Sequence, residues 1–409
     1  MSKEYPKKTK NIKVKKDFIY TILATSVGSA ALQLIVYPVV AREFGIDTLG
    51  EILFFIGIIY IVPQAFGNSL ANTRLLVRKD CESTNGDYNS HILAGIIVSF
   101  LACGVVGFAV TGNLPFCIMY GLFAILYMLK VYAGVEFRLV LNLKGYFIYY
   151  LITAIGYLAG LGLYYLTNNW LLIFAIGEGA ALVYVAMAGN IFKKEKKNAP
   201  PNVVKKTVAT FLYTTFIRDG VLQFDKVILM QMLSATAVAQ YNAISVVAKT
   251  MQVFVNPIVN FMLTYMTRKG WQLTRKINNI IVFGCIGFGA VFYVLSILVA
   301  PLYVRLFYPT LYDAVIQYNL MINLGLILWF VSSLVMTVLV SQGELKVFTV
   351  VQTIWGLSYI IVVYLAVMSH GLWGLACAMV AVNSGRVGVV LVLAAYKARN
   401  YPVRNTTDE

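Results

Sequence analysis

Long apolar runs alternate with short polar stretches along most of the chain. A helix needs roughly 20 apolar residues to cross the hydrocarbon core of a bilayer, and backbone groups in lipid must be paired within the protein. The pattern therefore predicts twelve membrane-spanning helices. Their predicted limits are 17–40, 50–72, 91–111, 114–134, 146–166, 170–192, 207–233, 237–265, 277–304, 315–341, 346–368 and 371–395.

The composition supports a lipid-facing surface. Hydrophobic residues make up 60% of the chain and charged residues 12%, against about 25% charged residues in soluble proteins. The net charge of +16 would suggest a nucleic-acid partner in a soluble protein. Here the lysines and arginines lie mostly between apolar runs, so membrane topology explains them and no nucleic-acid partner is expected. The first apolar run is too long for a cleaved signal peptide and predicts a retained span.

Basic residues also predict the orientation, because Lys and Arg concentrate in cytoplasmic loops. The N-terminal tail carries seven lysines, and the loops expected on the same side are rich in Lys and Arg. The loops expected outside hold only Arg42 and Arg305. Both termini are therefore predicted in the cytoplasm.

A polar linker, 193–206, divides the chain into two halves of six spans each. Pro200 and Pro201 within it stop a continuing helix. Because six is even, both halves enter the membrane from the same side, as in a parallel repeat. The predicted fold is an all-α polytopic membrane protein with two parallel six-helix bundles. Its predicted parts are a tail at 1–16, a bundle at 17–192, the linker, a bundle at 207–395 and a tail at 396–409.

Sequence signals of soluble enzymes are absent. There is no GxxxxGK[ST] sequence, no CxxC pair, and the two histidines, His91 and His370, lie far apart. No catalytic residue, metal ligand or cofactor is therefore expected. Architectural signals are present instead: Gly156, Gly160 and Gly162 are expected to allow close helix approach, and Pro63 to kink the second span.

Charged residues inside the spans are the candidate functional residues, because an ionisable group in mid-bilayer is costly and must face a partner or a wet cavity. Lys130 lies near a span end and is expected to extend its ammonium group toward water. The other candidates are Glu178, Arg218, Asp219, Asp225, Lys226, Lys249 and Arg386.

Two interpretations of these charges stay open. In one, they form ion pairs between helices and fix packing. In the other, Arg218, Lys249 and Arg386 line a central cationic cavity that binds an anionic substrate. Phosphate suits such a cavity, because Arg offers paired donors and Lys a point charge. Glu178, Asp219, Asp225 and Lys226 would then serve ion pairing, or proton or ion coupling.

Two segments resemble a known family. The stretch Val40-Ala41-Arg42-Glu43-Phe44-Gly45, followed by Leu49-Gly50-Glu51, resembles the opening pattern of Wzx-type polysaccharide flippases. These belong to the multidrug/oligosaccharidyl-lipid/polysaccharide exporter superfamily. Asp225 followed by Val238-Ala239-Gln240-Tyr241-Asn242-Ala243 resembles the matching segment of the second half, with Gln240 where the family often has Gly. Two six-span halves and a basic middle linker complete the likeness.

The resemblance implies a flippase that moves an undecaprenyl-diphosphate-linked oligosaccharide from the cytoplasmic to the outer leaflet. It implies two bundles around a cavity that opens alternately to each side of a bacterial cytoplasmic membrane. Its partners would be the lipid-linked glycan, membrane lipid, and polymerase and chain-length proteins of O-antigen, capsule or exopolysaccharide synthesis. Two alternatives remain: a multidrug and toxin extruder of the same superfamily, and an integral-membrane glycan polymerase or ligase.

Overall fold

All regular structure in the described residues is helical. The computed structural model describes residues 19–20, 22–24, 26–266, 275–341 and 345–400. Nine helical segments in these ranges are long and apolar enough to cross a membrane. The last of them turns back at Gly371, and α10 (Pro201–Met232) and α11 (Ala235–Met266) have 32 residues each. The predicted all-α membrane fold with twelve spans is confirmed.

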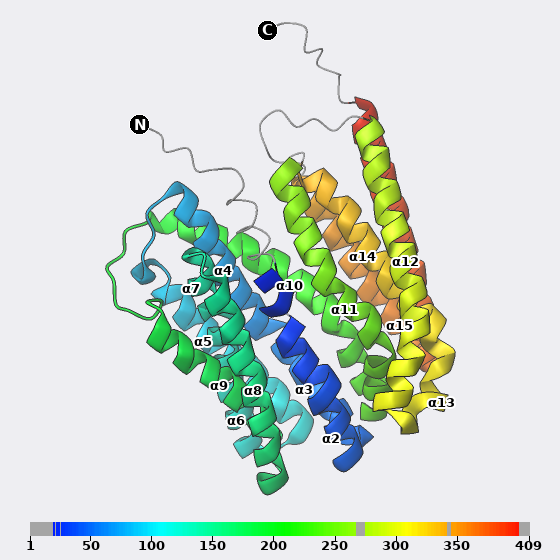
Figure 1. Cartoon of the computed structure of the whole chain (residues 1–409), viewed down its shortest axis with the longest axis horizontal. Coiled ribbons are helices and arrows are strands. Elements are labelled where there is room, and N and C mark those ends of the chain that lie inside the picture. The colour runs from blue at the N-terminus through cyan, green and yellow to red at the C-terminus, as the bar shows by residue number, and fades with distance from the viewer. Residues whose placement is uncertain (1–18, 21, 25, 267–274, 342–344, 401–409) are drawn as a thin grey trace, which may run out of the picture. The chain divides into compact units, whose positions relative to one another are not determined.

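The chain divides into two compact units, Met1–Val227 and Ile228–Glu409. Figure 1 shows the helices of each unit. The first unit contains η1 (Ala31–Val36), α2 (Tyr37–Glu43), α3 (Ile46–Ile59), α4 (Val62–Asp80), η2 (Asn85–Asp87), α5 (Asn89–Thr111), α6 (Leu114–Ala133), α7 (Val135–Leu139), α8 (Leu143–Thr167), α9 (Leu171–Ala188) and most of α10. The second contains α11, α12 (Arg275–Phe307), η3 (Pro309–Leu311), α13 (Tyr312–Val315), η4 (Ile316–Tyr318), α14 (Asn319–Ser341) and α15 (Leu345–Asn400).

Helix limits follow local backbone chemistry. The predicted second span is broken between α3 and α4, and Pro63 lies in the first turn of α4, where its missing N–H costs nothing. For the same reason α10 begins at Pro201, earlier than the predicted limit of 207. The predicted bundle limits remain a prediction. The predicted tail at 1–16 and residues 401–409 of the other tail lie outside the described residues.

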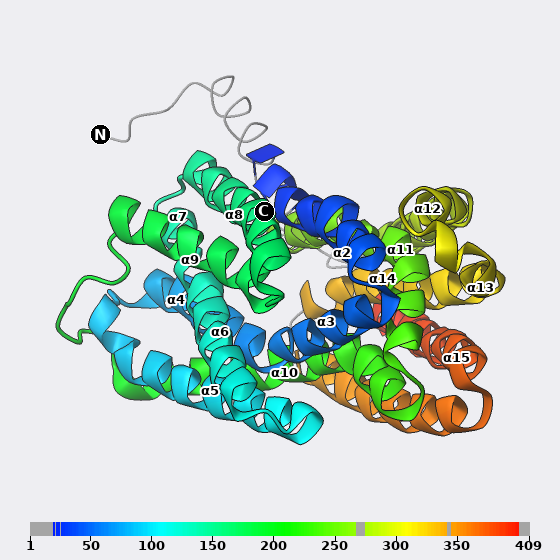
Figure 2. The same cartoon turned by 90° about the horizontal axis from the view of Figure 1, so that it is seen from below.

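Glycines allow α8 and α9 to pack closely in the first unit, as the view along the helices shows (Figure 2). A Cβ atom on Gly156 would lie 2.5 Å from the Cα atom of Gly177, and one on Gly160 would lie 2.6 Å from that of Ile173. The predicted role of these two glycines is confirmed. The prediction for Gly162 was wrong, because a Cβ atom there would meet nothing within 4 Å.

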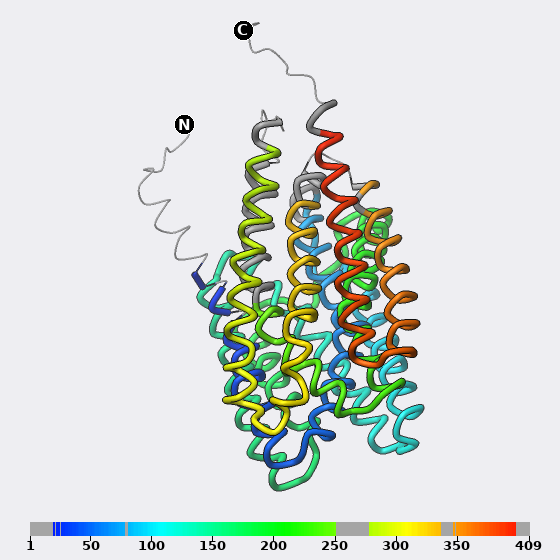
Figure 3. The backbone as a smooth tube through the Cα atoms, turned by 90° about the vertical axis from the view of Figure 1, so that its right-hand side faces the viewer, coloured from blue at the N-terminus to red at the C-terminus, as the bar shows by residue number. Residues whose placement is uncertain are grey.

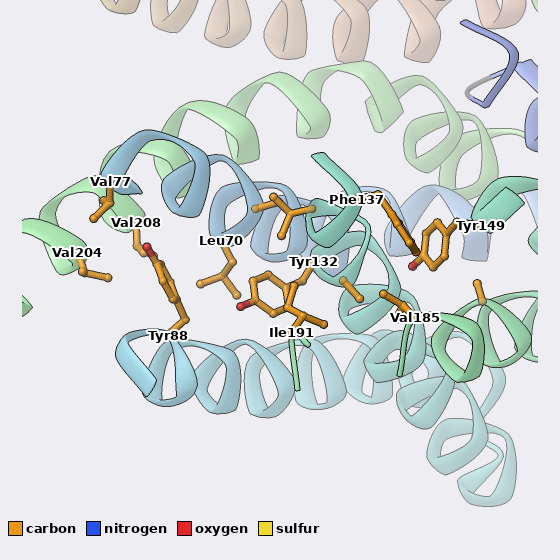
Figure 4. Packing of buried hydrophobic residues seen from close by; sticks show 14 of the residues in the cluster. Leu70, Val77, Tyr88, Tyr132, Phe137, Tyr149, Val185, Ile191, Val204 and Val208 are labelled. Carbon is orange, nitrogen blue, oxygen red and sulfur yellow. The ribbon is translucent and has the colours of Figure 1, made fainter. Parts of the chain in front are cut away.

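Aromatic and aliphatic side chains fill one end of the first unit (Figure 4). Tyr88, Tyr132 and Tyr149 are completely buried there. Val204 and Val208, four residues apart on α10, pack into the same cluster. Burial of this apolar face attaches the start of α10 to the first unit.

The segment between α9 and α10 is held against the loop before α5. Asn85 donates from its backbone N–H to Glu195 Oε2 at 2.7 Å, and from its side chain to the carbonyl oxygens of Asn190 at 2.8 Å and Lys193 at 2.9 Å. The hydroxyl of Thr84 donates to the carbonyl of Lys196 at 2.5 Å. These bonds fix the path of residues 189–200, the linker segment between α9 and α10.

Asp87 provides the charged part of this attachment. Its Oδ1 accepts from the backbone N–H groups of Asn198 at 2.8 Å and Ala199 at 3.2 Å, and its Oδ2 accepts from that of Thr84 at 2.8 Å. Burial raises the pKa of this carboxyl group, but the hydrogen bonds from the backbones of Thr84, Ala199 and Asn198 outweigh burial, so the pKa of Asp87 lies below its ordinary value. The attachment therefore uses the ionised carboxylate.

In the second unit, α15 is a hairpin of two antiparallel limbs, visible in orange and red in Figure 3. Gly371 has φ +56° and ψ −134°, a conformation that glycine adopts most easily. A Cβ atom on Gly374 would lie 1.8 Å from the carbonyl oxygen of Ala366. The turn therefore requires glycine at both positions.

Candidate functional site

A buried ion pair lies inside the first unit. Lys130 Nζ on α6 is 3.1 Å from Glu178 Oε2 on α9, and the two side chains are 8% and 1% exposed. The hydroxyl of Tyr157 on α8 donates to the other oxygen, Oε1. The pair lets two charges occupy an interior that would reject either alone. The prediction that Lys130 extends toward water was wrong.

Close helix packing forms this pair. Gly177 precedes Glu178, and a Cβ atom on it would lie 2.4 Å from the Tyr157 ring. A side chain at position 177 would push α8 away and separate Tyr157 from the carboxylate. Glu178 lies in the sequence Gly177-Glu178-Gly179, and the contact of Gly177 with Tyr157 shows why the first glycine is needed.

Aromatic rings surround the ammonium group of Lys130. Its Nζ lies 5.0 Å from the ring centre of Tyr150 and 5.8 Å from that of Tyr127. The Tyr149 hydroxyl donates to the Lys130 carbonyl at 2.6 Å. The electron-rich faces of the rings stabilise a cation that has little contact with water.

Hydrogen bonds continue from this aromatic group to α10. The Tyr127 hydroxyl donates to Gln64 Oε1 at 2.8 Å, and Gln64 Nε2 donates to Asp219 Oδ2 at 3.3 Å. Gln64 lies on α4, so side chains from α4, α6 and α10 are linked. Gln64 and Tyr127 were not among the predicted site residues. They are neutral, and only charged residues within the spans were selected from the sequence.

Arg218 ends this series of contacts. Its Nε donates to Asp219 Oδ1 at 2.8 Å, and its side chain is 48% exposed whereas that of Asp219 is 3% exposed. Among described residues, its two terminal amino groups have no hydrogen-bond partner. Asp219 therefore orients the guanidinium group and leaves its outer fork available to an anion.

Asp225 and Lys226 follow Arg218 and Asp219 on α10 by seven residues, about two helical turns. Their exposed fractions are 3% and 7%. Lys226 Nζ lies 5.9 Å from the ring centre of Tyr60, and that ring lies 5.5 Å from the ring of Tyr127. A Cβ atom on Gly57 would lie 3.3 Å from Lys226 Cδ. Lys226 is thus packed against the same aromatic group as Lys130.

The two remaining predicted cations belong to the second unit. Lys249 Nζ lies 4.2 Å from the ring centre of the buried Tyr241. Arg386 on α15 is 5% exposed, and its Cζ lies 4.2 Å from the ring centre of Trp355. The grouping of Arg218, Lys249 and Arg386 in one cavity remains a prediction.

No group of three His, Cys, Asp or Glu side chains in the described part of the chain is arranged to hold a metal ion.

Solved transporter structures have the same fold. An inward-facing multidrug resistance MATE family transporter of the MOP superfamily matches with a TM-score of 0.66 and 12% identity, covering 93% of this chain and 98% of that one. The lipid II flippase MurJ, in an inward closed conformation, matches with a TM-score of 0.66 and 15% identity, covering 96% and 88%. The fold is shared with MATE transporters and MurJ. No protein-family model and no curated protein matches the sequence.

Proposed function

We propose that the chain is a flippase that moves undecaprenyl-diphosphate-linked oligosaccharide repeat units from the cytoplasmic to the outer leaflet for surface polysaccharide synthesis. The single observation that carries the proposal is the arrangement of Arg218. Asp219 holds its Nε at 2.8 Å, while the side chain is 48% exposed. An oriented guanidinium fork is suited to bind two phosphate oxygens at once.

The balance of charge inside the spans favours an anionic cargo. Of the eight charged candidate residues named from the sequence, five are basic: Lys130, Arg218, Lys226, Lys249 and Arg386. In this scheme Arg218 contacts the diphosphate, and the polyprenyl tail remains in lipid. The likeness to the lipid II flippase MurJ supports a lipid-linked substrate.

The buried pair of Lys130 and Glu178 supplies a candidate for energy coupling. A carboxylate with 1% exposure that contacts both an ammonium group and a tyrosine hydroxyl would change the local charge if it took up a proton. The series of contacts through Tyr127, Gln64 and Asp219 reaches Arg218. Protonation at one end would thus alter electrostatics at the proposed substrate contact.

The distribution of basic residues supports the orientation, and the resemblance to polysaccharide flippases supports the choice of membrane. The proposal places the chain in a bacterial cytoplasmic membrane with both termini in the cytoplasm. Polymerase and chain-length proteins would use the exported units.

A multidrug extruder is the second candidate, because MATE transporters have the same fold. Cationic drugs call for exposed acidic side chains in the binding cavity. Asp219, Asp225 and Glu178 are instead buried, with 2%, 3% and 0% exposure. A glycan polymerase or ligase would need catalytic residues on an external loop, and every outer loop expected from the sequence is short.

A chromosomal deletion tests the proposal directly. Polyprenyl-linked glycans are extracted and surface polymer is measured. Loss of polymer, with single lipid-linked units accumulating on the cytoplasmic face of sealed vesicles, is the expected result. Unchanged surface glycan with increased sensitivity to cationic drugs would overturn the flippase assignment and support the extruder.

A further inference from the structure

Arg386 carries a charge that the long helices of its own unit do not balance. The second unit contains four acidic residues, Asp313, Glu344, Asp408 and Glu409. None lies on α11, α12, α14 or α15. Arginine stays protonated in proteins, so this guanidinium group needs a counter-charge that these helices do not supply.

Buried polar and aromatic side chains surround Arg386. Its Nη2 donates to Gln352 Oε1 at 3.0 Å, and its Cζ lies 4.2 Å from the ring centre of Trp355. The indole N–H of Trp355 donates to Asn383 Oδ1 at 3.0 Å. Asn383 Nδ2 in turn donates to the carbonyl of Gly325 on α14 at 2.9 Å. Gln352, Trp355, Asn383 and Arg386 are 8%, 6%, 2% and 5% exposed. Two limbs of α15 and α14 therefore enclose the guanidinium group.

Part of the guanidinium group is left without a partner. Its Nε and Nη1 are buried and make no hydrogen bond with any described residue. Buried N–H groups are almost always paired, and an exception points to a water or an ion. The indole N–H of Trp329, whose ring lies 6.4 Å from that of Trp355, is also buried and unpaired. All three unpaired atoms are donors, which only an acceptor can satisfy.

We propose that the unpaired Nε and Nη1 of Arg386, over Trp355 in the second unit, hold a small monovalent anion of the size of chloride. The anion supplies both the missing counter-charge and the missing hydrogen-bond acceptor. A diphosphate attached to lipid and glycan is too large for a group with 5% exposure. The proposed anion is therefore not the substrate diphosphate, which departs from the predicted role of Arg386 in substrate binding, and the proposal does not depend on what the chain transports.

Anion replacement in the purified full-length chain tests the site. Chloride is titrated against gluconate at constant ionic strength and cation, and thermal unfolding is followed by fluorescence. A ligand at 100 times its Kd increases the folded-to-unfolded ratio about 100-fold, so the unfolding midpoint should rise with chloride and saturate. Iodide should quench a saturable fraction of the tryptophan fluorescence, and chloride should reverse that quenching.

Matched variants locate the effect. Arg386→Gln should lose both saturable responses, whereas Arg305→Gln, the same change at an exposed position of the same unit, should keep them. Trp355→Phe should lose the reversible quenching. If Arg386→Gln does not fold, the wild-type titration and Trp355→Phe still decide the matter.

Three results would overturn the proposal. These are a wild-type protein with no saturable chloride effect, an equal effect in Arg386→Gln, and stabilisation by inorganic pyrophosphate at lower concentrations than by chloride. The last result would assign Arg386 to oxyanion binding instead.

Discussion

Lys130 and Glu178 lie 48 positions apart in the sequence, yet their charged groups are 3.1 Å apart in the interior of the first unit. Neither charge contacts water appreciably, so each depends on the other. The hydroxyl of Tyr157 donates a hydrogen bond to the other carboxylate oxygen, Oε1. The two side chains are only 8% and 1% exposed, so disruption of the pair should be costly.

Removing one partner of the pair should destabilise the protein strongly. Lys130→Met and Glu178→Gln should each lower the free energy of unfolding by about 3–5 kcal/mol, because an unpaired charge remains buried or a carboxylate loses its counter-ion. Thermal unfolding of the purified chain measures this. The double variant should lose much less than the sum of the single losses. Additive losses would mean that the two groups do not stabilise each other.

The approach of α8 to α9 should tolerate no side chain at Gly156. Gly156→Ala would place a Cβ atom 2.5 Å from Gly177 Cα and should cost about 1–3 kcal/mol through overpacking. Gly162→Ala on the same helix is the matched control, since it meets nothing within 4 Å. It should be neutral or stabilise by about 0.5–1 kcal/mol, as alanine favours helix. Equal unfolding midpoints for the two variants would contradict this account of the packing.

Arg218 should be needed for export but not for membrane insertion. Hydrogen bonds to charged groups contribute about 1.5–3 kcal/mol, so Arg218→Ala should reduce export of lipid-linked units by roughly tenfold or more. Arg218→Lys should retain part of the activity, because a point charge remains without the fork. Accumulated lipid-linked units and membrane protein level are the two measurements.

Arg138→Ala is the control for Arg218. Arg138 is also exposed but has no proposed role in binding, and the variant should export normally. Normal export by Arg218→Ala would remove Arg218 from the substrate contact.

Asp87 should make the linker segment sensitive to acid. Its pKa is lowered in the folded protein, so its contribution to stability is fully present above the ordinary Asp value of about 3.9 and is lost as the pH falls through the lowered pKa. Hydrogen exchange of residues 189–200 should therefore increase, after correction for intrinsic rates, as the pH falls below about 4.

Asp87→Asn should show the faster exchange already at neutral pH and lose the acid-dependent step. Glu82→Gln, an exposed acidic residue of the same loop, should behave as wild type. A linker that exchanges equally in all three proteins would show that Asp87 does not hold it.

The spans and the fold class could be predicted because their cause is local. Each apolar run has to form a helix in lipid whatever its neighbours are, and proline acts on its own turn, as at Pro63 and Pro201. The charged candidates were found for a similar reason, since a charge in an apolar run is visible in one dimension. The predicted helix limits were less accurate where a helix continues into polar sequence. For example, α10 begins at Pro201 and not at the predicted residue 207.

Which charges meet was decided by the tertiary structure alone. The sequence suggested that Lys130 reaches water, and gave no sign that Gln64 and Tyr127 connect its surroundings to Asp219. Gly156 and Gly162 look alike in the sequence, but one faces a neighbouring helix and the other faces open space. Composition and periodicity establish that a buried charge needs a partner. The partner itself depends on which helices become neighbours, and that is settled by packing between segments far apart in the chain.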